Sequence, residues 1–144
     1  MSWLENLFFF VTFGIIGVAM EVFFTAITSV IRKEKNRAMK GYSSLWMFFI
    51  YGSVYFVILF GRTYFSQYNF FLRGLIYLPL IYAIEFTSGF ILKKFKAIPW
   101  NYREDKNTKH NFKGIICLEF IPVWYTGGLL LELLYLFLKS HLVF

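Results

Sequence analysis

Four long apolar segments dominate the chain, and polar residues gather between them. A bilayer core about 30 Å thick needs about 20 apolar residues in a helix that rises about 1.5 Å per residue. The pattern therefore predicts an all-α fold, a polytopic bundle of transmembrane helices in a single integral membrane domain, residues 1–144. The four predicted spans cover about residues 7–31, 42–60, 70–92 and 114–138.

The last predicted span contains Pro122, which lacks a backbone N–H and disfavours a helix interior. Two interpretations stay open. One is a single long helix kinked at Pro122. The other is a short re-entrant or interfacial segment, residues 114–121, followed by a true span from Val123. At membrane depth, such irregular backbone must be buried in protein or face a water-filled cavity.

The composition supports the membrane prediction. Hydrophobic residues make up 58% of the chain and charged residues only 16%, whereas soluble domains average about 25% charged residues. The net charge of +7 does not indicate nucleic acid, because the cations lie between apolar runs and form no basic face. Membrane lipids, in particular the anionic cytoplasmic leaflet, are the expected partner. Cys117 is the only cysteine, so an internal disulfide is excluded, and a packed apolar site is expected for it.

The positive charges are distributed unevenly among the loops. Twelve of the 15 Lys and Arg residues fall within residues 32–41 and 93–113. The positive-inside rule therefore predicts a multi-pass protein of the cell membrane with these two loops in the cytoplasm and both termini outside.

Glutamates within membrane spans are costly and usually face the bundle interior. Four glutamates fall within the predicted spans: Glu21, Glu85, Glu119 and Glu132. Measured from the cytoplasmic end of each span, Glu21, Glu85 and Glu119 lie about 16, 12 and 9 Å deep. Glu132 lies nearer the outer face, where Arg62 and Arg73 are also expected.

Small and polar residues recur at helical spacing beside these glutamates and predict that the acids face neighbouring helices. They are Gly14, Gly17, Thr25 and Thr28 in the first span, Tyr82, Ser88 and Gly89 in the third, and Tyr125 and Gly128 in the fourth. For Glu21, Glu85 and Glu119 we predict a shared polar cavity. These acids would be protonated, bind a cation or cationic group, or meet snorkelling lysines. The alternative is a purely structural role, in which protonated glutamates make hydrogen bonds between helices and hold the bundle together.

Other chemistry is sparse. His110 and His141 are too far apart in the predicted topology for a metal site, and no catalytic residue, cofactor or nucleotide-binding motif is indicated. Secondary candidates for the site, besides Glu132, are Trp100, Asn101 and Tyr102 in the cytoplasmic loop.

Four stretches carry a resemblance to a known family. They read G-I-I-G-V-A-M-E from Gly14 to Glu21, S-S-L-W-M-F-F-I-Y-G from Ser43 to Gly52, E-F-T-S-G-F-I-L-K-K-F-K-A-I-P-W-N-Y from Glu85 to Tyr102, and N-F-K-G-I-I-C-L-E-F-I-P-V-W from Asn111 to Trp124. The chain resembles the transmembrane protein 229 family and its bacterial relatives, named "putative ABC transporter type IV permeases", over nearly its whole length.

The resemblance implies a small multi-pass membrane protein. It also carries the family's marked positions onto Glu21, Gly52, Glu85, Gly89, Pro99, Trp100, Tyr102, Gly114, Glu119, Trp124 and Glu132. The chain departs from the family pattern at Asn101, where Asp is usual, at Arg103, where Ser is usual, and in the charged stretch 104–110. A role that relies on an acid in this loop is therefore not expected.

Three functions fit these observations. The first is a permease-like or transport-related component with a carboxylate cavity near the cytoplasmic side. With four spans and no nucleotide-binding motif, it would act as a homo-oligomer or with a partner subunit such as an ATPase. The second is an intramembrane enzyme acting on a lipid, with paired carboxylates and Trp100, Asn101 and Tyr102 at the interface. The third is a non-catalytic scaffold or interaction protein.

Overall fold

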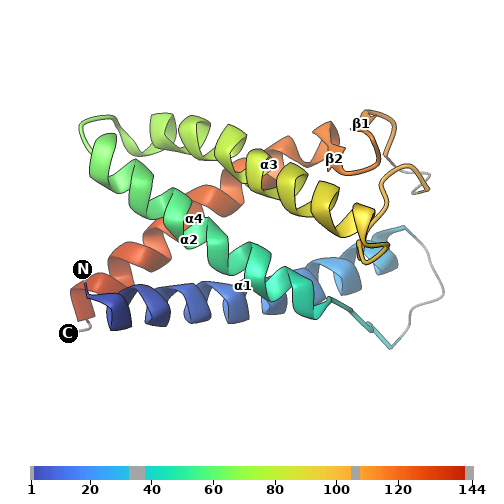
Figure 1. Cartoon of the computed structure of the whole chain (residues 1–144), viewed down its shortest axis with the longest axis horizontal. Helices are drawn as coiled ribbons and strands as arrows, with labels where there is room; N and C mark the ends of the chain where they lie inside the picture. The colour runs from blue at the N-terminus through green and yellow to red at the C-terminus, as the bar shows by residue number, and fades with distance from the viewer. Residues whose placement is uncertain (1, 33–37, 105–107, 142–144) are drawn as a thin grey trace. The chain divides into compact units, whose positions relative to one another are not determined.

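The computed structural model describes residues 2–32, 38–104 and 108–141, and its elements follow one another as in Figure 1. In this part of the chain four helices are long and apolar enough to cross a membrane: α1 (Trp3–Ile31), α2 (Leu45–Tyr64), α3 (Phe70–Lys94) and a fourth formed by the short 3-10 helix η1 (Leu118–Phe120) with α4 (Ile121–His141). The predicted all-α membrane bundle is confirmed. Two short strands, β1 (Asn111–Phe112) and β2 (Ile116–Cys117), complete the described elements.

The chain forms two compact units, residues 1–53 and 54–144, and α2 contributes to both. In the first unit, α1 begins with a capping box in which Ser2 and Glu5 satisfy each other's backbone N–H groups. Close packing follows at two glycines: a Cβ at Gly17 would lie 2.3 Å from Cγ of Tyr51, and one at Gly14 would lie 2.7 Å from the Phe48 ring. Small residues thus let α1 approach the first half of α2.

In the second unit, α3 and α4 pack along each other through small residues. A Cβ at Gly74 would lie 2.7 Å from the Tyr125 ring and 2.8 Å from Leu129. Gly128 sits against Tyr77, and the Tyr125 hydroxyl donates to the Phe71 carbonyl at 3.1 Å. The predicted inward face of the fourth span is therefore confirmed as its contact with α3.

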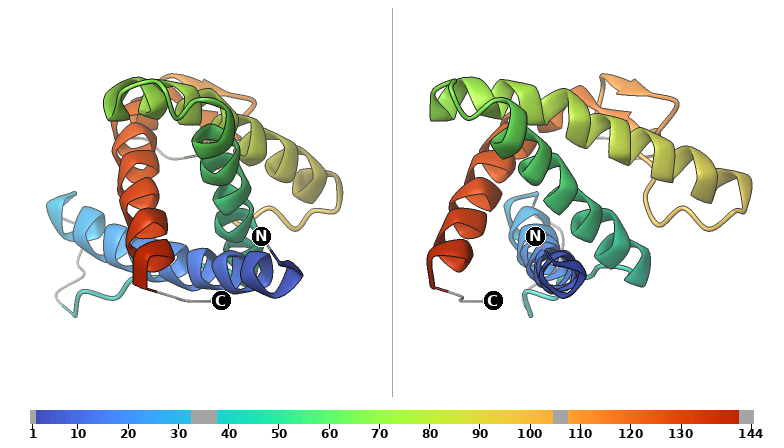
Figure 2. Two further views of the ribbon diagram at one scale, coloured as in Figure 1. Left: turned by 90° about the vertical axis from the view of Figure 1, so that its left-hand side faces the viewer. Right: turned by 60° about the vertical axis from the view of Figure 1, so that its left-hand side comes forward.

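The antiparallel hairpin of β1 and β2 pairs Asn111 with Cys117 and Phe112 with Ile116. Its turn uses left-handed backbone at Lys113 (φ 56°) and Gly114 (φ 73°). Both views in Figure 2 show the hairpin, in orange, beside α3. A Cβ at Gly89 would lie 2.5 Å from Cγ2 of Ile115 and 2.9 Å from the Trp100 ring, so the glycine gives the hairpin its place against the helix.

The hairpin corrects the predicted boundaries of the last span. Residues 114–117 are not helical, and the kinked long helix is replaced by a non-helical segment followed by helix, closer to the second interpretation. Pro122 occupies the first turn of α4, where its missing N–H has no helical partner to lose, so it starts the helix rather than kinking it. The other spans keep their expected positions, each with ends shifted by a few residues.

Candidate functional site

Glu21 lies in the first unit on the face of α1 that meets the segment before α2. The Ser43 hydroxyl donates a hydrogen bond of 2.5 Å to Glu21 Oε2. One turn further, the Thr25 hydroxyl accepts from the Tyr42 N–H at 2.9 Å and lies 3.1 Å from the Tyr42 carbonyl. With Gly14 and Gly17, these contacts confirm that the polar stripe of the first span faces protein.

Glu85, the acid of α3, is buried, with 5% of its surface exposed. The Tyr102 hydroxyl donates to Glu85 Oε1 at 2.9 Å. The indole of Trp124 approaches the same carboxyl group. Glu85 Oε2 is buried and has no well-formed hydrogen bond, and no Lys, Arg or His within the described ranges forms an ion pair with this carboxyl group.

Side chains from α3 and from the loop after it hold the hairpin by its carbonyl groups. The Trp100 indole donates to the Ile115 carbonyl at 3.0 Å, and the Tyr82 hydroxyl donates to the Cys117 carbonyl at 2.8 Å. The Lys93 ammonium donates to the Lys113 carbonyl at 2.8 Å. The hairpin thus packs along the second half of α3. Tyr102 links it to Glu85, because the Tyr102 N–H donates to the Gly114 carbonyl at 2.9 Å while the Tyr102 hydroxyl donates to Glu85.

Glu119 organises the approach to the hairpin. Its Oε1 accepts backbone hydrogen bonds from Lys109 at 2.8 Å and His110 at 2.9 Å, and the His110 ring lies 3.1 Å away. Its Oε2 accepts from the Cys117 thiol at 3.0 Å. The side chain is 34% exposed, which differs from the expected burial because the hairpin, and not a helix, leads into this position.

Cys117 occupies the packed site expected for it, with no exposed surface. Burial, and then the hydrogen bond to the Glu119 carboxylate, raise the pKa of the Cys117 thiol to about 11. The thiol therefore stays protonated and donates to Glu119. Cys117 is therefore a structural residue of the hairpin, and its thiol does not have the character of an activated nucleophile.

Asn101 has a local role, unlike the two aromatic residues on either side of it. Its side-chain amide donates to Glu104 at 2.7 Å, and its Oδ1 accepts from the Arg103 N–H at 3.2 Å. Of the secondary candidates in this loop, only Tyr102 touches a buried acid, while Trp100 binds the hairpin. Residues 105–107 of the predicted cytoplasmic loop, and 33–37 of the other, lie outside the described residues.

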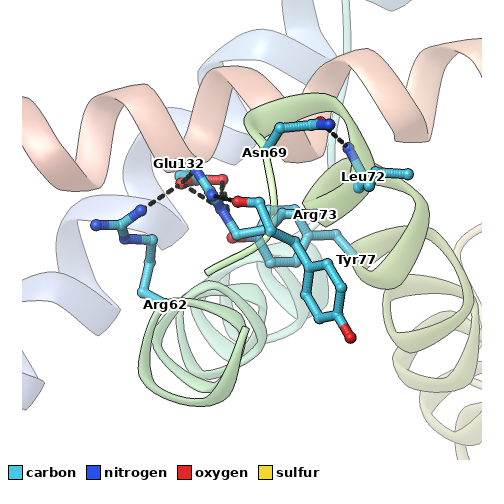
Figure 3. Close-up of polar contacts among 7 residues, drawn as sticks. Arg62, Asn69, Leu72, Arg73, Tyr77 and Glu132 are labelled. Atoms are coloured by element: carbon cyan, nitrogen blue, oxygen red, sulfur yellow. Dashed lines mark hydrogen bonds and ion pairs between the residues drawn. The ribbon is translucent and has the colours of Figure 1, made fainter. Parts of the chain in front are cut away.

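Glu132, a residue of α4, lies beside the first turns of α3, at the end opposite the hairpin, in a charged cluster drawn in Figure 3. It is fully buried, and Arg73 binds it through Nε at 2.9 and 3.1 Å and through Nη2 at 2.6 Å. The Tyr77 hydroxyl donates to Oε2 at 2.8 Å, and Arg62 Nη1 lies 3.3 Å from Oε1. Both arginines that the sequence places near the outer face thus meet Glu132. Tyr77 was not foreseen, although its position one turn after Arg73 is the sequence signal that would place it there.

Metal chemistry finds no support in the described part of the chain, where no group of three or more His, Cys, Asp or Glu side chains could hold an ion. The acids of the second unit lie in separate environments. Glu85 and Glu132 are each buried among their own partners, and Glu119 lies beside the hairpin. Such four-helix architecture with buried acids defines a small multi-pass α-helical membrane protein.

Comparison with known families makes this class more specific. Residues 8–143 match the family described as "Putative ABC-transporter type IV". The chain belongs to this family, which makes it a small, transport-related membrane protein. No solved structure matches the chain. The resemblance to the transmembrane protein 229 family stays a prediction.

Proposed function

We propose that this chain is the membrane-embedded component of a transport system, in which Glu85 binds a proton or a cationic group. One observation carries the proposal: Glu85 is 5% exposed, its polar neighbours are the neutral Tyr102 hydroxyl and Trp124 indole, and its Oε2 has no well-formed hydrogen bond. A buried carboxyl group without a counter-charge is stable only if it is protonated or binds a cation. Ionisable groups at such positions in membrane spans mark ion or substrate pathways.

Glu21 and Glu119 are the companions of Glu85 in this proposal, and a cavity shared by the three remains a prediction. The hydrogen bonds that each carboxyl group already accepts indicate how readily it could bind a ligand. Glu21 has a hydroxyl donor on Oε2, whereas both oxygens of Glu119 already accept hydrogen bonds from the hairpin region. A ligand would displace fewer protein contacts at Glu85 and Glu21 than at Glu119. We therefore expect Glu85 to contribute most and Glu119 least.

The distribution of charge supports an orientation for this site. The loops at residues 32–41 and 93–113 hold most of the Lys and Arg residues, so we place them in the cytoplasm of a cell-membrane protein with both termini outside. The hairpin end of α3, with Glu85, then lies toward the cytoplasm. The end with Glu132 lies toward the outside.

A transport cycle needs more than this chain supplies. Four spans are few for a pathway across the membrane, and the sequence carries no nucleotide-binding motif. We therefore propose a homo-oligomer or a partner subunit, and the family suggests an ATPase as the partner. Crosslinking in native membranes followed by mass spectrometry would identify either assembly.

Vesicle assays test the role of Glu85. Native membrane vesicles that retain any partner subunit would be loaded with a pH-sensitive dye, and entry of protons and of methylammonium, a small cation probe, would be followed. We expect Glu85→Gln to abolish the entry of protons and of methylammonium, because the neutral amide cannot carry a charge or exchange a proton.

Glu119→Gln is the comparison variant in the same unit, and we expect it to reduce entry least, because both oxygens of Glu119 already accept hydrogen bonds from the hairpin region. Unchanged entry in Glu21→Gln, Glu85→Gln and Glu119→Gln vesicles would remove the proposal. Retained phenotype in the Gln variants with loss of the folded protein in Leu variants would instead favour a scaffold.

A further inference from the structure

The charged cluster around Glu132 holds more positive than negative charge. Two arginines, Arg62 and Arg73, meet the single carboxylate, and the third polar partner, Tyr77, is a neutral phenol that donates to it. No other acid joins the cluster within the described residues. One unit of positive charge is therefore left over at the edge of a cluster whose carboxylate is fully buried, and an unbalanced charge beside such a site is costly.

The surplus belongs to Arg62 and not to Arg73. Arg73 is 8% exposed at its side chain, engages both carboxylate oxygens, and uses Nη1 to donate to the Tyr68 carbonyl. Together with the Tyr77 hydroxyl, Arg73 occupies the acceptor positions of Glu132. Arg62 adds only a single longer contact of 3.3 Å. Arg62 is thus the arginine that contributes less to the neutralisation of Glu132.

Arg62 keeps most of its donors available. A guanidinium has five N–H donors, and the contact to Glu132 is the one hydrogen bond that Arg62 makes to the described chain. Its side chain is 29% exposed, so the donors are reachable from outside the protein. The exposed rings of Tyr64 and Tyr68 lie within six residues of it in sequence, at the end of α2 and in the turn that follows. Tyrosines at a span end are typical of the level of lipid headgroups.

We propose that Arg62 is a binding site for a phosphate group carried by a membrane lipid. A planar guanidinium fork matches the oxygens of a phosphate with two parallel hydrogen bonds. A lipid with a net negative charge would balance the surplus positive charge of the cluster. The lipid headgroup fits better than a free ion, because the site lies where the apolar helix α2 ends and the apolar helix α3 begins. Both helices carry large exposed side chains there, among them Phe60 and Phe71.

Binding of defined ligands to the purified chain tests this assignment. Native mass spectrometry of the protein in detergent micelles would be titrated with phosphatidylglycerol, with phosphatidylcholine, and with inorganic phosphate. We expect phosphatidylglycerol to bind tightest. Arg62→Gln should weaken this binding at least about tenfold, the effect of losing charge-assisted hydrogen bonds. Arg62→Lys, which keeps the charge and loses the fork, should fall between the two.

Lys139→Gln is the matched control, because it removes one positive charge from α4 without touching the cluster. Equal weakening in Lys139→Gln and Arg62→Gln would show diffuse charge attraction and overturn the site. So would unchanged phosphatidylglycerol binding in Arg62→Gln that elutes as a folded protein. Binding of inorganic phosphate in preference to both lipids would overturn the lipid as its source.

Discussion

The two ends of α3 treat a buried carboxyl group in opposite ways. At one end, Glu132 is fully buried and is held by a bidentate arginine, a second arginine and a tyrosine hydroxyl. At the other, Glu85 is almost as deeply buried, yet its polar neighbours are neutral. The Tyr102 hydroxyl donates to Oε1 and the Trp124 indole approaches the carboxyl group, while Oε2 has no well-formed hydrogen bond. The first arrangement uses the acid for stability. The second surrounds the acid with neutral side chains. The difference teaches that burial alone does not decide how the charge of a membrane acid is compensated.

The largest effect should come from breaking the compensated end. Glu132→Gln leaves Arg73 buried without its counter-charge, and we expect a loss of about 3 kcal/mol in the free energy of unfolding. Thermal unfolding in detergent micelles, followed by circular dichroism, would measure it. A loss below about 1 kcal/mol would mean that the cluster is solvated and that the contrast between the two ends is wrong.

Cys117 reports on the hairpin end through its reactivity. Its pKa is raised from 9.0 to about 11, so at pH 8 the folded protein should react with iodoacetamide about a hundredfold more slowly than the unfolded chain. Because the folded state holds this proton more tightly, the contribution of Cys117 to stability is present below pH 9 and is lost as the pH rises toward 11. Labelling rates measured between pH 7 and 11 would check both statements. Equal rates at pH 8 in folded and unfolded protein would show that the hairpin does not cover the thiol.

Gly89 tests the seat of the hairpin. A methyl group there would meet Ile115 at 2.5 Å, so Gly89→Ala should destabilise the protein by about 1–2 kcal/mol through overpacking. Hydrogen exchange of residues 111–117 should increase at the same time. Gly127→Ala is the control, since no atom lies within 4 Å of its added methyl group and alanine favours the helix by up to about 1 kcal/mol. Similar behaviour of the two variants would remove the close contact between hairpin and α3.

The smallest effect on stability should follow Glu85→Gln. The variant keeps the shape of the side chain and can keep the hydrogen bond from Tyr102, so we expect a change under about 1 kcal/mol in the free energy of unfolding. The same thermal measurement as for Glu132→Gln makes the comparison direct. If Glu85→Gln destabilised the protein as much as Glu132→Gln, the Glu85 carboxyl group would have a charged partner and the proposed site would lose its basis.

Much of the site could be read from the chain because helical periodicity decides which residues share a face. Tyr82, Glu85 and Gly89 fall on one face of α3, and all three indeed meet the hairpin or its flanking loop. Depth along the spans likewise placed Glu132 near Arg62 and Arg73, the two arginines that it meets, but it did not indicate Tyr77. The hairpin was missed because its second strand, Ile116–Cys117, is as apolar as the helix that follows, and because the turn before it depends on left-handed backbone at Lys113 and Gly114.

By itself, the sequence determined that this is a four-span helical membrane protein, and it identified the acids that face protein. These properties depend on the length and period of apolar runs, which are local. Only the tertiary structure decided that Tyr77 joins the two arginines at Glu132, and that Tyr102 and Trp124 are the polar neighbours of Glu85. These contacts depend on whether a side chain from another segment reaches the same depth and direction, which no local pattern encodes.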